Sequence, residues 1–266
     1  MTPEEYRAAP GLNFSLAKHL LRSGAHFRAA VEAPEAPTHE MEIGTMLHAW
    51  VLEDKPPRYI VKPDGMKLST KDGITFKAEA EADDRTILAY DEAAMLVRIL
   101  ANLADNRTIQ NAFRGCQKRE LPLFADFDGV AIKGLIDMLG EDATGAATLL
   151  DFKTANDASD HGFGTAVATY HYLMQAAWYS ALVSLHLALE QPPRFAWIVA
   201  ETSAAGVCRL IQPTPEQMGL GDRQMERCIR RFKECQERNV WPGYSNGGVS
   251  TLRLPAWAYR EEEDAI

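Results

Sequence analysis

Apolar residues in the middle of the chain fall into short runs separated by turns rich in Gly and Asp, a pattern that predicts β-strands. The clearest pair of runs lies between Lys133 and Thr154, where the intervening Gly-Glu-Asp-Ala-Thr-Gly predicts a β-hairpin. The pair Asp128-Gly129 predicts a second hairpin, which joins a strand at 120–126 to one that begins at Val130. Further short apolar runs predict strands at 59–61, 195–200 and 207–211.

Apolar residues spaced three and four apart predict helices elsewhere. These helices are expected over residues 12–32, 41–53, 89–114, 158–189 and 214–239. The last one opens with Thr214-Pro-Glu-Gln217, a capping box with proline at the first helical position. Residues 55–84, apart from the strand at 59–61, are expected to form a mobile surface loop or a loop that holds a phosphodiester strand. No internal repeat or linker is visible, so we expect one domain over residues 1–266.

Composition narrows the class of protein only a little. The net charge of −9 speaks against a protein coated in positive charge, but it leaves room for a basic groove on an acidic body. No apolar run is long enough to cross a bilayer and the N-terminus shows no signal-peptide pattern, so we expect a cytoplasmic protein without a membrane partner. The four cysteines lack Cys-x-x-Cys spacing and are expected to be free, buried thiols.

Three charged side chains interrupt the apolar hairpin. Asp137 lies in its first strand, while Asp151 and Lys153, two residues apart, leave the same face of the second strand. Two carboxylates about 4 Å apart repel by roughly 4 kcal/mol at an effective dielectric of ~20, so the pair needs a cation or a shared proton. A hard divalent ion with oxygen ligands is one solution, and it suits phosphate chemistry. A buried Asp–Lys ion pair with an unrelated Asp in the turn is the other, and the spacing alone favours neither.

Four more residues are candidates for the same centre, and each has a plain structural alternative. Glu120 is either a third acid aimed at that centre or an edge-strand residue in water. His48 lies beside apolar residues of its predicted helix and is either a metal ligand or a residue of the core. Gln175 and Tyr179 are one helical turn apart, so they either face the acids together or mark the polar border of an amphipathic helix.

Basic side chains gather in the first and the last predicted helix. Arg22, Arg28 and Arg231 are the residues that we expect to contact DNA phosphates if these faces bind nucleic acid. The alternative is that both helices present a solvated charged face.

Taken in order, these segments resemble the PD-(D/E)XK nuclease superfamily, and more closely the C-terminal nuclease domain of exonuclease VIII and its phage relatives. The matching motifs span nearly the whole chain: Gly44-Thr-Met-Leu-His48 with Glu53, Gly134-Leu-Ile-Asp137, Asp151-Phe-Lys-Thr154, Tyr170-His-Tyr-Leu-Met-Gln175 with Tyr179, and Leu254-Pro-Ala-Trp-Ala258. The resemblance implies an α/β (α+β) fold of the restriction-endonuclease type, with a central mixed β-sheet flanked by helices.

The resemblance also implies a metal site. His48, Asp137 and Asp151 would bind Mg²⁺, with Mn²⁺ as a substitute, as one ion or a pair of ions. The Phe152 carbonyl would be a further ligand. The sequence departs from the pattern of many members at one ligand, because Asp151 stands where they have Glu.

The implied reaction is the degradation of linear double-stranded DNA from its 5′ ends, which leaves 3′ single strands for annealing recombination. Lys153 would orient or activate the attacking water, and Gln175 and Tyr179 would position Lys153 or the DNA strand. The implied partners are double-stranded DNA ends, a single-strand annealing protein and further copies of the chain in a ring. On this resemblance we expect a nuclease domain without the long N-terminal extension of the bacterial exonuclease, which bears on regulation and partner choice.

Three other functions fit the same residues. A nuclease of this superfamily that acts on flaps or single-stranded ends would be distinguished by end-labelled flap substrates. A non-catalytic DNA-binding recombination scaffold would release no nucleotides when metal is added. A metalloenzyme for small phosphate esters would hydrolyse a chromogenic phosphodiester in the absence of DNA.

Overall fold

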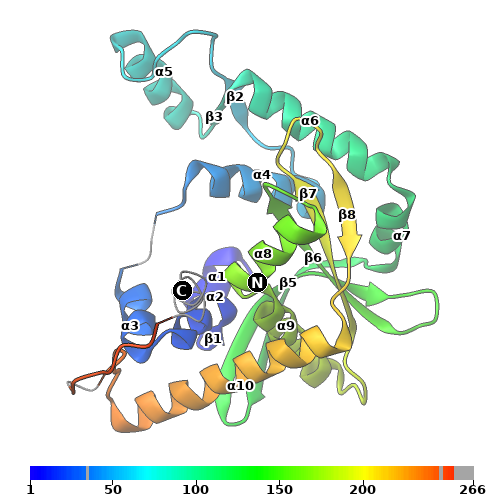
Figure 1. Ribbon diagram of the computed structural model, residues 1–266. Helices are drawn as coiled ribbons and strands as arrows, with labels where there is room; N and C mark the ends of the chain where they lie inside the picture. Colours follow the sequence, from blue (N-terminus) through cyan, green and yellow to red (C-terminus); the bar gives the residue numbers. More distant parts are fainter. Residues whose placement is uncertain (34–35, 246–247, 255–266) are drawn as a thin grey trace, which may run out of the picture.

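The computed structural model describes residues 1–33, 36–245 and 248–254. A six-stranded sheet has the order β1-β5-β6-β7-β8 with β4 paired to β5, and β2 and β3 form a second, two-stranded sheet (Figure 1). The strands are β1 (Leu12–Asn13), β2 (Tyr59–Val61), β3 (Thr86–Leu88), β4 (Lys118–Phe127), β5 (Val130–Glu141), β6 (Ala147–Ala155), β7 (Arg194–Glu201) and β8 (Cys208–Ile211). The helices are α1 (Pro3–Ala8), α2 (Phe14–Ala17), the 3₁₀ helix η1 (Lys18–Leu21), α3 (Gly24–Glu32), α4 (His39–Glu53), α5 (Lys71–Ala82), α6 (Tyr90–Asp105), α7 (Arg107–Gly115), α8 (Asp160–Tyr170), α9 (Tyr172–Leu187) and α10 (Pro215–Arg238).

The main sheet contains both parallel and antiparallel pairs. The antiparallel pairs β4–β5 and β5–β6 are the two hairpins predicted from their turns. β6 and β7 run parallel, and α8 and α9 form the crossover between them. The strands predicted at 195–200 and 207–211 are present as β7 and β8, and they pair antiparallel. This mixed sheet flanked by helices confirms the predicted fold class.

Helices cover both faces of the main sheet (Figure 1). The core on one face contains Leu149 of β6 with Trp178 of α9 and residues of α10. The core on the other face contains Leu150 with Leu47 of α4 and residues of α6 and α7. Leu149 and Leu150 belong to opposite layers because successive side chains of a strand alternate between its faces. The hairpin that carries the acids is therefore sandwiched between the two layers.

Three predicted helices are interrupted, each by a residue that caps a new helix or leaves helical geometry. The 12–32 segment starts with the short strand β1 and breaks at Ser23, whose side chain caps α3. Asn106 separates α6 from α7 and caps α7 in the same way. The 158–189 segment divides at His171, whose φ of 59° lies in the left-handed region.

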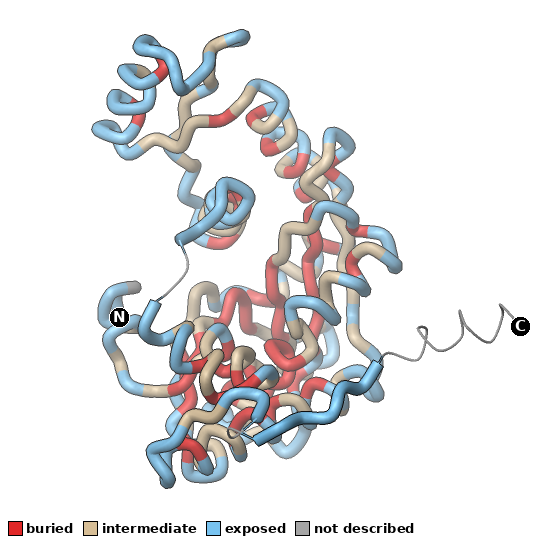
Figure 2. Tube along the Cα trace, turned by 60° about the vertical axis from the view of Figure 1, so that its left-hand side comes forward, coloured by how far each residue is buried: buried red, intermediate tan, exposed pale blue. Residues whose placement is uncertain are grey.

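The segment 55–84 differs most from its prediction as an irregular loop. Residues Lys71–Ala82 form helix α5, which is capped by a hydrogen bond from the Gly73 amide to the Thr70 hydroxyl. Its buried residues are the small Gly73 and Ala80, which explains why no apolar helical period is visible in the sequence. Together with the β2–β3 pair, α5 forms an arm that stands apart from the main sheet and is largely exposed (Figures 1 and 2).

The N-terminal helix α1 is fastened to the main sheet by a buried lysine. The Lys133 ammonium on β5 donates hydrogen bonds to the carbonyl oxygens of Tyr6, Arg7 and Ala9, over 2.6 to 3.1 Å. Carbonyls at a helix C-terminus lack partners within the helix, so a cation placed there satisfies them and complements the helix dipole.

The cysteine prediction is confirmed for three of four thiols. All four are free; Cys116, Cys228 and Cys235 are buried, whereas Cys208 is partly exposed. Burial raises the pKa of Cys116 to about 11 and that of Cys228 to about 12, so these thiols stay protonated at neutral pH.

Within the described residues, no helix is both long and apolar enough to cross a membrane. The motif at 254–258 lies outside the described residues apart from its first position.

Candidate metal centre

The two acids of the central hairpin lie where its strands separate. The β5–β6 ladder ends at the pair Met138 and Leu150, and the same register would next bring Asp137 opposite Asp151. Beyond this point β6 continues to pair with β7, and β5 with β4. The two carboxylates therefore leave diverging strands instead of a regular ladder.

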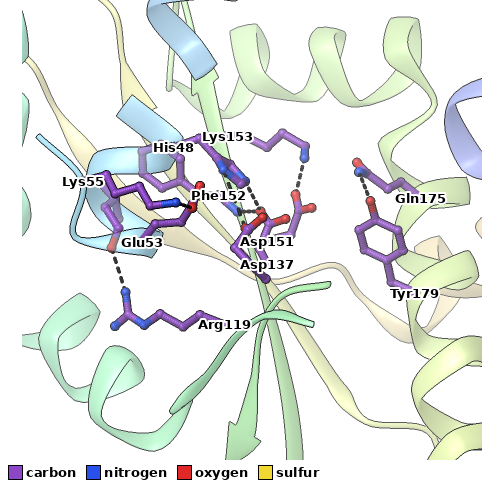
Figure 3. A network of polar contacts seen from close by, with 12 residues as sticks. His48, Glu53, Lys55, Arg119, Asp137, Asp151, Phe152, Lys153, Gln175 and Tyr179 are labelled. Atoms are coloured by element: carbon purple, nitrogen blue, oxygen red, sulfur yellow. Dashed lines mark hydrogen bonds and ion pairs between the residues drawn. The ribbon is translucent and has the colours of Figure 1, made fainter. Parts of the chain in front are cut away.

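Two contacts orient the Asp137 carboxylate. Its Oδ2 accepts a hydrogen bond from the Phe152 amide across the fork, with an N–O distance of 2.8 Å. The same oxygen lies 3.2 Å from Nε2 of His48 on α4 (Figure 3). Because Asp137 is buried, these contacts hold its charge at one position beside the imidazole.

A close approach of α4 to the hairpin brings His48 to the site. Gly44 lies one turn before His48, and a Cβ atom at Gly44 would be 3.1 Å from Oγ1 of Thr154 on β6. Arg119 of β4 fastens the end of the helix, because its guanidinium donates a 2.7 Å hydrogen bond to the Val51 carbonyl. Sequence reasoning missed Arg119, since its partner is a backbone carbonyl 68 residues away that no side-chain pattern reveals.

Glu120 reaches the same centre through an uncommon backbone conformation. Its φ of 49° lies in the left-handed region, which residues other than glycine rarely adopt. The register on either side places it opposite Asp137, but the β4–β5 ladder skips this position. Its Oε1 lies 3.8 Å from Nδ1 of His48 and is buried without a hydrogen-bond partner among the described residues. A left-handed backbone and an unpaired buried oxygen at one residue are features often found at functional sites, which makes Glu120 a candidate for this centre.

Asp151 and Lys153 form the other half of the site. The Lys153 Nζ lies 2.5 Å from Oδ2 of Asp151. Asp151 is 0% exposed, and in the part of the chain that the structure describes its oxygens accept no hydrogen bond beyond this ion pair. The Asp–Lys ion pair considered as an alternative to a metal site is therefore present, but Asp137 belongs to the same cluster and not to a turn.

Gln175 and Tyr179 of α9 lie beside Asp151 and Lys153, on the side away from His48 (Figure 3). The Gln175 amide donates to the Tyr179 hydroxyl over 3.1 Å, while its own oxygen is buried and unpaired among the described residues. α9 can lie this close to β5 because Gly134 has no side chain: a Cβ there would be 2.6 Å from a methyl carbon of Leu182. Burial raises the pKa of Tyr179, and the neighbouring carboxylates raise it further, so its hydroxyl is a neutral donor.

Burial and neighbouring charges shift the pKa values of the residues in this cluster. Burial raises the pKa of Glu120 to about 7, with the Asp137 charge adding to the effect and His48 opposing it. Burial also raises the pKa of Asp151, against the Lys153 charge. For His48, burial alone would lower the pKa, but the hydrogen bond and charge of Asp137 reverse the direction. Burial would likewise lower the pKa of Lys153, yet Asp151 and Asp137 raise it, so the ammonium keeps its charge.

The donor set fits a hard divalent ion. One ligand atom each from His48, Glu120 and Asp137 can be chosen so that all lie within 4.8 Å of one another. Carboxylate oxygens suit Mg²⁺, and a neutral imidazole is tolerated by Mg²⁺ and preferred by Mn²⁺. Glu120, predicted as a catalytic acid, thus becomes a candidate ligand. Ligation by Asp151 and by the Phe152 carbonyl stays a prediction.

The three arginines predicted to contact DNA each have a protein partner. Arg28 forms an ion pair with Glu32 at 2.6 Å, and Arg22 donates to the Tyr244 hydroxyl over 3.4 Å. Arg231 donates to a backbone carbonyl of η1 and so links α10 to that element. None of these contacts tests DNA binding, which stays a prediction for all three residues.

Replacing Glu120 with glutamine is expected to stabilise the metal-free protein while weakening metal binding. Folding raises the pKa of this carboxyl from 4.5 to about 7. Its ionisation therefore does not affect stability below about pH 4.5, lowers the free energy of unfolding progressively between pH 4.5 and 7, and opposes folding fully above pH 7. At pH 8 in a chelator, Glu120→Gln should melt a few degrees higher than wild type, for a gain on the order of 2 kcal/mol. Added Mg²⁺ should then stabilise the variant less than wild type.

The control is Glu141→Gln, at the exposed end of β5, which should change neither quantity. A Glu120→Gln protein that melts below wild type at pH 8 in chelator would contradict this assignment of the carboxylate.

A mixed sheet between helices, with a fork between two strands that carries two acids and a lysine, matches the fold expected for the PD-(D/E)XK superfamily. The chain belongs to the family described as a PDDEXK-like domain of unknown function (DUF3799), whose model matches residues 13–254. No curated protein sequence matches the chain significantly.

Solved structures include one with the same fold. The crystal structure of a candidate exonuclease from Eubacterium rectale has a TM-score of 0.62 and 13% sequence identity, with 97% of this chain and 97% of that chain covered. The crystal structure of SSO0001 is 13% identical and covers 88% of this chain and 86% of that one, but its TM-score of 0.36 supports no argument. At this level of identity the first likeness concerns the fold alone, and it extends over nearly the whole chain.

Proposed function

We propose that the protein is a metal-dependent exodeoxyribonuclease that hydrolyses linear double-stranded DNA from 5′ to 3′ and leaves 3′ single strands for annealing recombination. The observation that carries this proposal is the fork at Asp137 and Asp151, with one acid ion-paired to Lys153 and the other facing His48 and Glu120. Buried acids without hydrogen-bond partners are costly, so their presence favours a role in binding and catalysis. The nuclease fold points to phosphodiester hydrolysis.

The metal of this proposal is Mg²⁺, with Mn²⁺ as a substitute, as one ion or two. His48, Asp137 and Asp151 would hold it, with Glu120 and the Phe152 carbonyl as further oxygen ligands. A divalent ion supplies Lewis acidity toward both the scissile phosphate and the attacking water.

Lys153 is suited to act as a hydrogen-bond donor and not as a general base. Asp151 and Asp137 hold it in the charged form, and the 2.5 Å ion pair keeps its ammonium beside Asp151 at the fork. In this role its hydrogen bonds orient the attacking water and stabilise negative charge that develops on the phosphate.

Gln175 and Tyr179 supply neutral polar groups at the edge of the fork. The buried, unpaired Gln175 oxygen can accept a hydrogen bond from the Lys153 ammonium or from a base N–H or terminal hydroxyl of the DNA strand. The Gln175–Tyr179 hydrogen bond fixes the amide so that this oxygen has a defined direction. We infer that the pair positions Lys153 or the strand that is cut.

The proposed partners follow from the same resemblance: double-stranded DNA ends, an annealing protein, and copies of the chain in a ring. A cytoplasmic location and a single domain over residues 1–266 belong to the proposal too.

A substrate comparison tests the proposal. The protein is incubated with Mg²⁺ and linear duplexes labelled at the 5′ or the 3′ end, with a 5′-phosphate or a 5′-hydroxyl, beside covalently closed circular DNA, a flap substrate and a chromogenic phosphodiester. We expect nucleotides to be released from 5′ ends of linear duplex and the circle to stay intact. Preferred cutting of flaps or of the small diester would overturn this choice of substrate, and no cutting of any substrate would overturn the enzymatic function.

Activity is expected to be higher with Mn²⁺, or to extend to more substrates, because an imidazole ligand binds Mn²⁺ better than Mg²⁺. The measurement is the initial rate of nucleotide release at equal concentrations of the two ions near neutral pH. His48→Asn, which removes the imidazole, should abolish the difference. Inactivity with both ions would count against the metal site.

A further inference from the structure

Lys153 has a second neighbour besides Asp151. Its Nζ lies 5.1 Å from the centroid of the Tyr172 ring, within the ~6 Å over which a cation is attracted to an aromatic face. The lysine side chain is 14% exposed, so water screens this attraction little. Lysine carries a point charge on a flexible stem, and one ion pair fixes the distance to its partner but not the direction of the ammonium.

The Tyr172 ring is held in place by the chain around it. Tyr172 is the first residue of α9, and the left-handed His171 before it sets the angle between α8 and α9. The ring contacts Phe163 with centroids 6.3 Å apart, and Phe163 packs edge-on against Trp197 of β7 at 5.7 Å. The ring facing Lys153 is thus connected to the strand next to β6 through rigid aromatic contacts.

The attraction does not depend on a charge on Tyr172. Burial raises the pKa of its hydroxyl from the ordinary value, and the Lys153 charge only partly opposes this, so the side chain is neutral at physiological pH. The Lys153 ammonium therefore interacts with the face of an uncharged aromatic ring.

We propose that Tyr172 is a positioning residue for the proposed reaction: its ring face holds the Lys153 ammonium in a direction that serves the attacked phosphate, while Asp151 holds its charge. The inference rests on the proposed function. It distinguishes Tyr172 from Gln175 and Tyr179, which act through hydrogen bonds.

Kinetics of three variants test the proposal. Tyr172→Leu removes the ring and is expected to lower kcat for DNA hydrolysis roughly tenfold, with KM for DNA and the half-saturating Mg²⁺ concentration within about twofold of wild type. Tyr172→Phe keeps the ring and should stay within about twofold of wild type. The matched control is Tyr170→Leu, since the Tyr170 ring contacts Tyr172 in a tilted arrangement with centroids 5.7 Å apart, but Tyr170 is 54% exposed and the proposal assigns it no contact with Lys153.

A measurement without DNA separates this proposal from the proposed function. In protein labelled with ¹³C-lysine, the Lys153 ε-methylene signal, assigned by its loss in Lys153→Met, should be shifted by the Tyr172 ring current. The shift should persist in Tyr172→Phe and disappear in Tyr172→Leu, or in Tyr172→Met if the leucine variant does not fold. An inactive wild-type protein overturns the proposed function, and this signal still tests the ring contact.

Two outcomes would overturn the positioning role. If Tyr172→Phe loses as much kcat as Tyr172→Leu, the hydroxyl matters and not the ring. If Tyr172→Leu keeps wild-type kcat, or leaves the Lys153 signal unmoved, the ring is part of the core and does not hold the ammonium.

Discussion

Replacing Asp151 with asparagine is expected to reduce Mg²⁺-dependent hydrolysis of linear duplex DNA by at least about 10³-fold. The substitution keeps the size of a fully buried side chain but removes the charge that pairs with Lys153 and, in the proposal, binds the metal. The protein should remain folded, because losing the ion pair is offset by relief of repulsion from Asp137. Initial rates of nucleotide release measure the loss, and a thermal melt monitored by circular dichroism confirms folding.

Asp142→Asn is the matched control for this substitution. Asp142 lies in the turn of the same hairpin, where its Oδ1 accepts hydrogen bonds from Thr144 and Ala146 that an asparagine oxygen can also accept. The Asp142→Asn protein should hydrolyse linear duplex DNA at the wild-type rate. An active Asp151→Asn protein would remove this carboxylate from the reaction.

Replacing Lys153 with methionine is expected to lower kcat by about 10² to 10⁴-fold while leaving metal binding nearly unchanged. Methionine fills much of the same space but carries no charge. The attacking water and the scissile phosphate therefore lose the hydrogen-bond donor that the ammonium supplies. Binding of Mn²⁺, measured by calorimetry, should be retained, and this separates the lysine from the ligands. Loss of binding along with activity would instead place Lys153 among the groups that build the metal site.

Lys118→Met provides the comparison for a lost lysine. Lys118 is exposed at the start of β4, and its replacement should leave the rate of hydrolysis unchanged. A comparable loss in both lysine variants would indicate a general effect of charge on DNA binding, since DNA affinity depends on the number of cations in contact with phosphates.

The parts of the site that were predictable from sequence are those in which neighbours along the chain determine geometry. Alternation along β6 places Asp151 and Lys153 on one face, and helical spacing places Gln175 above Tyr179. The turn residues between β5 and β6 bring Asp137 near Asp151. These features follow from local periodicity, which a single sequence records directly.

Other parts depend on contacts that local patterns do not record. Glu120 turns toward His48 only because its backbone is left-handed, a conformation that Glu does not favour on its own. The turn at His171, which presents Tyr172 to Lys153, interrupts a stretch whose apolar residues read as one helix. Helix α5 was not predicted because it buries little apolar surface and so shows no helical period of apolar residues. The capping residue Thr70 was the one local pattern that could have indicated its start.

The position of a bound ion tests the central claim most directly. Crystals of the protein grown with Mn²⁺ would be measured for anomalous scattering, which locates the ion independently of any assumed ligand. We predict a peak at the fork, within coordination distance of His48 and Asp137 and of at least one oxygen from Asp151 or Glu120. Mn²⁺ bound elsewhere on the protein with the fork empty would contradict the assignment of this cluster as the metal centre.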